Sequence, residues 1–250
     1  MQRPTLAAIA FLAASVLTIP ARADLITVAN HSFEDTTGQT VFNEFTFGTP
    51  VGWQIYDPFA IQGTGVFTGT LEPNGIEFFN STAPDGNLVG ILFNSQREGD
   101  GEYGFEQTLT DVLMPDTTYS LDVEVGNIAS GTATNGTFFN LDEFPGYRVE
   151  LLAGGIVIAE DLNSLSIPEG EFLTSTVSFT TGAAHPQLGM DLGIRLVNLN
   201  AIPAGFTQAT SPDLEVDFDN VRLTTTAIPE PAGTGFALFL LTTIAFRRQR

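Results

Sequence analysis

The sequence predicts an all-β protein whose body folds as a two-sheet antiparallel jelly-roll sandwich. Apolar and polar residues alternate along many short stretches, and Gly, Pro, Asn and Asp cluster between these stretches. No part of the body keeps the 3.6-residue period of an amphipathic helix, so we expect few helices there. Short strands separated by regular turn signals are typical of antiparallel sandwiches and barrels.

The alternation defines about ten strands, because side chains on a strand point to opposite faces with a period of two. In one of them, Leu121, Val123 and Val125 alternate with two acidic residues. The other candidates are Leu25 to Val28, Ile76 to Phe79, Leu88 to Phe93, Tyr103 to Leu109, Val149 to Leu151, Ile156 to Ala159, Val177 to Phe179, Ile194 to Leu196 and Leu214 to Asp219. Two longer loops, 128–145 and 201–212, are either functional or variable solvated insertions.

Composition restricts the chemistry that the chain can perform. It has no cysteine, which excludes thiolate catalysis and disulfides. A net charge of −20 repels phosphate backbones, so we expect no nucleic-acid partner. The same charge favours divalent cations, since calcium prefers carboxylate oxygens, although it is also sufficient simply to keep a secreted protein soluble.

The two ends of the chain predict export. Residues 1–23 have a basic start, an apolar core and small residues before Asp24, as a cleavable signal peptide has; a first transmembrane helix is the alternative. At the other end, residues 228–250 contain an apolar stretch, 232–246, which is shorter than the ~20 residues that usually span a bilayer. We interpret it as a single transmembrane helix, with a buried core helix as the alternative. Its flanking residues are Pro229, Glu230 and Pro231 before it and Arg247, Arg248 and Arg250 after it.

This tail resembles the PEP-CTERM sorting signal of Gram-negative bacteria, in which Pro-Glu-Pro precedes a short transmembrane stretch and an arginine cluster. The resemblance implies processing by an exosortase, transient inner-membrane association, and delivery to the cell surface or an extracellular matrix rich in exopolysaccharide. Residues 24–227 would be the domain delivered.

The body is similar to jelly-roll carbohydrate-binding modules and galactose-binding-like domains. The similar segments are Asn30 to Asp35, Gly52-Trp53, Phe105 to Leu109, Thr117 to Leu121 and Asp217 to Leu223. The resemblance implies one structural calcium ion joining the opening loop to the last strand, with Glu34 and Asp219 as ligands. Asp217 shares a strand face with Asp219, so it is added to the predicted set. The alternative is that these are solvated surface acids.

Sugar binding requires aromatic faces for stacking, and four residues are candidates for this role. Trp53 follows Gly52 and alternatively packs in the core, and Tyr147 at the end of the long loop can lie either in a site or in the core. The predicted ligand-binding set is Trp53, Tyr56, Tyr103 and Tyr147.

No catalytic constellation is recognisable. The chain lacks a Gly-x-Ser-x-Gly elbow, and His31 and His185 have no partner at metal-ligand spacing. The sequence therefore predicts a non-enzymatic surface or matrix protein whose domain binds polysaccharide. The alternatives are a structural or adhesive matrix protein without a sugar site, and a carbohydrate-active lyase or hydrolase.

Overall fold

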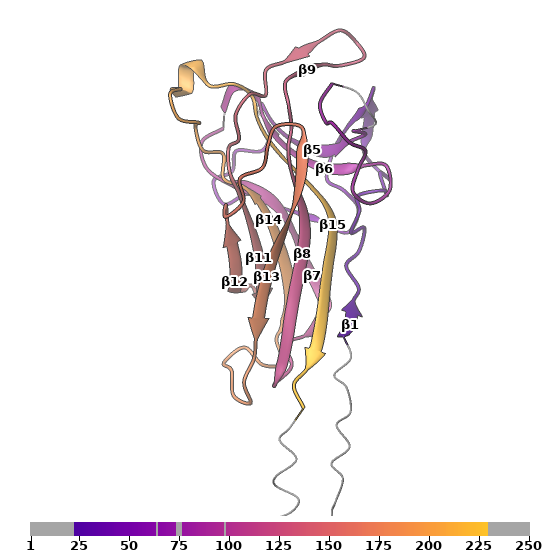
Figure 1. Ribbon diagram of the computed structural model, residues 1–250, viewed down its shortest axis with the longest axis vertical. Helices are drawn as coiled ribbons and strands as arrows, with labels where there is room; N and C mark the ends of the chain where they lie inside the picture. Colours follow the sequence, from indigo (N-terminus) through magenta and orange to yellow (C-terminus); the bar gives the residue numbers. More distant parts are fainter. Residues whose placement is uncertain (1–22, 64, 74–76, 98, 230–250) are drawn as a thin grey trace, which may run out of the picture. The chain divides into compact units, whose positions relative to one another are not determined.

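The computed structural model describes residues 23–63, 65–73, 77–97 and 99–229. Residues Ala23–Ala227 form one compact unit whose regular secondary structure consists almost entirely of antiparallel strands (Figure 1). The prediction of an all-β antiparallel protein is confirmed. In the described residues no helix is long and apolar enough to cross a membrane. The predicted signal helix, the transmembrane stretch 232–246 and the sorting residues Glu230, Pro231, Arg247, Arg248 and Arg250 lie outside the described residues, and Pro229 lies just inside them.

Two large sheets face each other. The larger one has the order β13 (Glu171–Thr180), β8 (Thr117–Asn127), β15 (Leu214–Ala227), β6 (Val89–Asn94), β5 (Val66–Leu71), β3 (Phe45–Phe47) and β2 (Thr40–Phe42), with β1 (Ala23–Ile26) also paired to β15. The smaller one has the order β12 (Ile156–Leu162), β11 (Tyr147–Ala153), β14 (Asp191–Asn198), β7 (Tyr103–Val112) and β4 (Gln54–Tyr56). A separate hairpin is formed by β9 (Gly131–Thr132) and β10 (Phe138–Phe139), and two single-turn 3-10 helices are η1 (Ser95–Arg97) and η2 (Gln208–Thr210).

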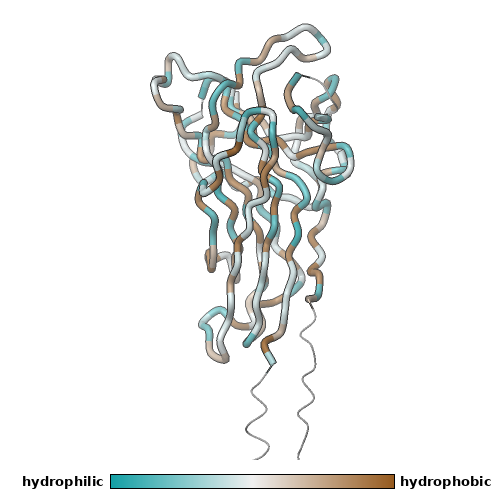
Figure 2. The backbone as a smooth tube through the Cα atoms, viewed as in Figure 1, coloured by the Kyte–Doolittle hydropathy of each residue, from teal (hydrophilic) through white to brown (hydrophobic). Residues whose placement is uncertain are grey.

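The main core lies between the two sheets and is made by alternate residues of the long strands. Leu121, Val123 and Val125 of β8 face Val149 and Leu151 of β11 across it, and all five are completely buried. Figure 2 shows the resulting alternation of hydrophobic and hydrophilic positions along these strands. Burial of this apolar surface at ~25 cal/mol per Å² is the main stabilising contribution.

A second apolar layer covers the outer face of the larger sheet at one end. On β5 and β6 its residues, Leu71, Val89 and Ile91, have the opposite parity to Val66 and Leu92, which face the main core. The layer includes Phe45, Leu71, Phe78, Phe79, Val89, Ile91, Ile128 and Leu141. Figure 1 places the β9 hairpin at the same end of the sandwich as β5 and β6.

Close packing of β3 on β5 requires a glycine. A Cβ atom at Gly69 would lie 1.8 Å from the carbonyl oxygen of Thr46, a main-chain atom that cannot move without breaking the pairing. We predict that Gly69→Ala lowers the free energy of unfolding by about 1–3 kcal/mol through overpacking. Gly182→Ala, where a Cβ meets no atom within 4 Å, is the matched control and should be near neutral. Urea unfolding of both variants measures this, and equal stability of the two would contradict the argument.

Candidate functional site

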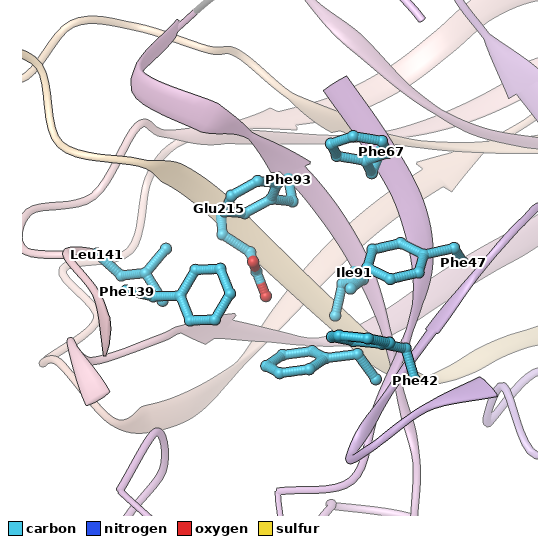
Figure 3. A pocket seen from close by; sticks show the side chains of 9 residues that line it. Phe42, Phe47, Phe67, Ile91, Phe93, Phe139, Leu141 and Glu215 are labelled. Carbon is cyan, nitrogen blue, oxygen red and sulfur yellow. The ribbon is translucent and has the colours of Figure 1, made fainter. Parts of the chain in front are cut away.

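A cavity of about 130 Å³ opens on the outer face of the larger sheet, within the second apolar layer. Alternate residues of neighbouring strands build its floor: Phe93 of β6 is paired with Phe67 of β5 on one side and with Glu215 of β15 on the other. Figure 3 shows the carboxyl group of Glu215 pointing into the middle of the surrounding rings. The lining residues are Phe42, Phe45, Phe47, Phe67, Ile91, Phe93, Phe139, Leu141 and Glu215.

The acidic side chains at this site are a buried pair on β15. Glu215 and Asp217 are two residues apart and therefore share a face of the sheet, where only 4% and 0% of their surfaces are exposed. Within the described residues, Glu215 Oε1 and both carboxylate oxygens of Asp217 lack a hydrogen-bond donor. A buried ionised carboxylate without donors is strongly unfavourable, so the pair will hold a proton.

The pKa values of this pair follow from that burial. Burial raises the pKa of Glu215 to about 8; a hydrogen bond that Glu215 and Asp217 share through the pair's proton opposes this rise, and the charge of Asp213 adds to it. Burial, and then the neighbouring charge of Glu215, raise the pKa of Asp217 as well. Two carboxyl groups in one desolvated place do not both ionise, because like charges repel there. The pair is thus a carboxylic acid that keeps its proton near neutral pH.

Tyr103 approaches the same acids from the main core. Its side chain is completely buried, and Asn198 Nδ2 lies 3.5 Å from its hydroxyl oxygen. Burial raises the pKa of Tyr103, and the charges of Glu215 and Asp217 raise it further, so this hydroxyl stays neutral beside the acid pair. Asn198 is fixed in turn by donating a 3.0 Å hydrogen bond to the carbonyl of Leu92.

A second pair of acidic side chains, Glu34 of the opening loop and Asp219 of β15, holds the segment 85–88. Asp219 accepts hydrogen bonds of 2.7 Å from the backbone N–H groups of Asp85 and Asn220. Glu34 accepts two bonds of the same length from Asn87 and Leu88. Burial raises the pKa of Asp219 to about 8; the two backbone bonds oppose this, and the charges of Asp85 and Glu34 add to it.

The structure therefore separates the predicted calcium ligands. Glu34 and Asp219 interact electrostatically, with Asp85 as a third carboxylate nearby, whereas Asp217 belongs to the pair with Glu215. The described residues contain no group of three or more His, Cys, Asp or Glu side chains arranged to hold a metal ion.

The four predicted sugar-stacking residues do not form an exposed platform. Trp53 is only 5% exposed and stacks on Phe33 at 5.5 Å. Tyr103 and Tyr147 are fully buried, and the Tyr147 hydroxyl donates a 2.6 Å bond to Asp161. Tyr56 is partly exposed. Its ring packs beneath the guanidinium group of Arg195 at 4.0 Å, on the outer face of the smaller sheet.

Comparison with known proteins identifies the family. A sequence model described as HpiC1-like, the HpiC1 cyclase, matches residues 24–224. The chain belongs to the HpiC1-like cyclase family. No curated protein matches it. Among solved structures, an apo cyclase from Fischerella sp. is 38% identical with a TM-score of 0.70, covering 84% of this chain and 98% of the other.

Two further Fischerella structures hold small indole compounds. A Stig cyclase from Fischerella sp. TAU, in complex with (3Z)-3-(1-methyl-2-pyrrolidinylidene)-3H-indole, is 40% identical, with a TM-score of 0.69 and coverage of 82% of this chain and 100% of the other. A cyclase from Fischerella sp. TAU, in complex with 4-(1H-indol-3-yl)butan-2-one, is 41% identical, with a TM-score of 0.67 and coverage of 84% and 100%.

These matches overturn several predictions. The recognition of a PEP-CTERM protein with a carbohydrate-binding body is wrong, because the family model of a cyclase covers the body. The prediction of a non-enzymatic protein is also wrong, since family and relatives indicate an enzyme. The predicted partners, an exosortase and a polysaccharide, are replaced by a small-molecule substrate.

Sequence reasoning did not single out Glu215, and it grouped Asp217 with Asp219 rather than with Glu215. The alternative it gave for Asp217 and Asp219 was solvated surface acids, whereas both are completely buried in the structure. The available signal was the unbroken apolar run from Leu88 to Phe93, which is typical of a strand buried on both faces.

The raised pKa of Glu215 makes stability depend on pH. From the ordinary value of 4.5 up to about 8, the folded protein keeps a proton that the unfolded chain has lost, so stability falls as pH rises through this window. The slope is at most about 1.4 kcal/mol per pH unit for each such group. We predict that Glu215→Gln flattens the fall of Tm between pH 5 and pH 8. Exposed Glu160→Gln is the control; a Glu215→Gln slope equal to that of the wild type would contradict the assignment.

Proposed function

We propose that this protein is a cyclase that uses the Glu215–Asp217 pair as a Brønsted acid to close a ring on a small aromatic substrate. One observation carries the proposal: a carboxylic acid that stays protonated near neutral pH points into a cavity lined otherwise by six phenylalanines, an isoleucine and a leucine. General acids need a pKa near the operating pH, and burial in an apolar site is the usual means of reaching it.

The substrate class follows from the cavity walls and from the relatives. A cavity of about 150 Å³ lined by apolar side chains admits benzene, so about 130 Å³ holds roughly one aromatic ring, with the remainder of the molecule at the open side. Aromatic rings pack well on phenylalanine faces and edges. Because two related cyclases hold indole compounds, we propose an indole carrying an unsaturated side chain.

The chemistry needs no net oxidation or reduction. The acid pair transfers its proton to the unsaturated side chain, which leaves a carbocation on the neighbouring carbon. The π electrons of the indole ring attack this carbon and form the new carbon–carbon bond. Loss of a ring proton to the carboxylate restores both aromaticity and the acid. The phenylalanine faces stabilise the cation and exclude water that would otherwise capture it.

Removing the acid should abolish this reaction while leaving binding largely intact. We predict that Glu215→Gln and Asp217→Asn each lower kcat about 10²–10⁴-fold, the usual contribution of a general acid. The dissociation constant of 4-(1H-indol-3-yl)butan-2-one should change much less. The measurements are product formation from alkenyl indoles and calorimetric titration. In the wild type, activity should fall as pH rises through about 8; Glu160→Gln serves as the control, and full activity of both pair variants would refute the assignment.

One structural calcium ion held by Glu34 and Asp219, with backbone oxygens and water as its further ligands, is a second part of the proposal. Carboxylate oxygens are calcium's preferred ligands. Burial, and to a lesser extent the charges of Asp85 and Glu34, raise the pKa of Asp219, and a cation beside it would favour its ionised form. Gly86, with φ of +83°, leaves room beside Glu34, since a Cβ there would lie 2.3 Å from Glu34 Oε1. Such an ion would fasten the opening loop to β15.

Calcium should therefore stabilise the protein, and more strongly at pH 8 than at pH 6, because its binding displaces a proton from Asp219. We predict that millimolar calcium raises Tm by at least about 3 °C relative to a chelator, as measured by differential scanning fluorimetry. Asp219→Asn should lose this response. Asp217→Asn should keep it, and an unchanged wild-type Tm would exclude the ion.

A further inference from the structure

One wall of the aromatic cavity is carried by a hairpin that pairs with neither large sheet. Strands β9 and β10 pair only with each other. Phe139 of β10 lies against the cavity, with its ring centroid 5.8 Å from that of Phe45 and 6.1 Å from that of Phe93. Leu141 follows it in the lining. Besides the 2.8 Å backbone hydrogen bond from the N–H of Asp213 to the carbonyl of Asn140, the position of this wall depends on side-chain contacts rather than on a strand ladder.

The hairpin is held at its turn by Glu44. One carboxylate oxygen of Glu44 accepts a 2.9 Å hydrogen bond from the backbone N–H of Thr134, and the other accepts a 2.6 Å bond from the Thr134 hydroxyl. The two residues are 90 positions apart, and Glu44 is only 9% exposed. Burial alone would raise the pKa of Glu44, but the bonds from Thr134 and from its own backbone outweigh this and lower it.

Glu44 also belongs to the neighbouring wall, which the β2–β3 hairpin builds. It occupies the two-residue turn between β2 and β3, next to Asn43, whose φ of +59° is one that asparagine tolerates. The strands on either side of this turn supply Phe42 and Phe45 to the cavity. A single carboxylate thus connects the hairpin that carries Phe42 and Phe45 with the hairpin that carries Phe139.

A second, weaker contact holds the other strand of the hairpin. Glu77 accepts a 2.6 Å hydrogen bond from the backbone N–H of Thr132. Near the base, the Ser130 hydroxyl accepts a bond from the N–H of Leu141 and donates one to Asp142. Phe138 at the edge of the hairpin is 65% exposed. Of these contacts, that of Glu44 is the one that joins the hairpin to β2 and β3, which supply Phe42 and Phe45 to the cavity.

We propose that Glu44 is a positioning residue that latches the β9–β10 hairpin to the β2–β3 hairpin through Thr134, so that Phe139 closes the aromatic wall around the substrate ring. Opening of the same contact is the route by which a substrate reaches Glu215. This inference rests on the proposed function for the identity of the ligand, whereas the latch itself is a property of the free protein. Hydrogen bonds to charged acceptors contribute more than neutral ones, so two of them on one carboxylate suit such a latch.

Hydrogen exchange of the free protein tests the latch without any ligand. We predict that Glu44→Ala speeds exchange of backbone amides in residues 130–141 about 10- to 100-fold, because local opening becomes more frequent. Glu44→Gln, which retains one acceptor oxygen, should lie between Glu44→Ala and the wild type. Thr134→Ser keeps both donors and should behave as the wild type, whereas Thr134→Val keeps only the backbone donor. Thr137→Val, an exposed position on the same hairpin, is the matched control.

Binding of 4-(1H-indol-3-yl)butan-2-one then links the latch to the cavity. Titration calorimetry should give a dissociation constant about tenfold weaker for Glu44→Ala and an unchanged one for Thr134→Ser and Thr137→Val. Unaltered exchange of residues 130–141 in Glu44→Ala would overturn the latch, as would faster exchange with unchanged affinity. If exchange speeds up but the wild type itself does not bind the indole, the latch stands as a structural contact and the proposed substrate class fails.

Discussion

The burial of two adjacent carboxyl groups on one strand is the constraint on which the rest of this structure depends. Glu215 and Asp217 have almost no exposed surface, and three of their four oxygens lack a donor among the described residues. The desolvation of such groups costs several kcal/mol, so they remain only if they stay protonated and the surrounding packing is strong. The second apolar layer supplies both conditions, because it removes water and fills the space with phenylalanine rings.

This constraint explains why the larger sheet is apolar on both faces at one end. On β15, Val216 and Phe218 pack in the main core, while Glu215 and Asp217 point the other way. A β-sandwich is stabilised by the face that packs in the main core. Burying the outer face as well requires additional hydrophobic side chains and two hairpins that cover it. Alternate residues of β15 therefore have different roles: those on the inner face pack in the main core, and those on the outer face are the two buried acids.

The sequence was sufficient for the fold class and insufficient for the site. Alternation along β8 and β15 predicts which residues enter the main core, because a period of two follows from strand geometry alone. The acids at the other parity look like solvated surface residues, and only long-range packing by β3, β5, β6 and β10 places them in a cavity. Trp53 and Tyr147 show the reverse error, because they were predicted on an exposed platform and lie in the core. Their indole N–H and phenol O–H groups can be buried there because each donates a hydrogen bond, to Asn30 and to Asp161 respectively.

The resemblance to carbohydrate-binding jelly rolls misled the functional assignment for a physical reason. The segments that carry it, Asn30 to Asp35 and Asp217 to Leu223 among them, are joined by a 2.9 Å backbone hydrogen bond from Val221 to the carbonyl of His31. This contact belongs to the fold rather than to any one ligand. The proposed chemistry instead depends on the apolar layer that covers Glu215 and Asp217. Glu215 and Asp217 would be two ordinary surface carboxylates if they were open to water. Under Phe93, Phe139 and their neighbours they are desolvated, which raises their pKa values. In the proposed mechanism the chemistry therefore depends on the covering layer, part of which comes from the short strands β3 and β10.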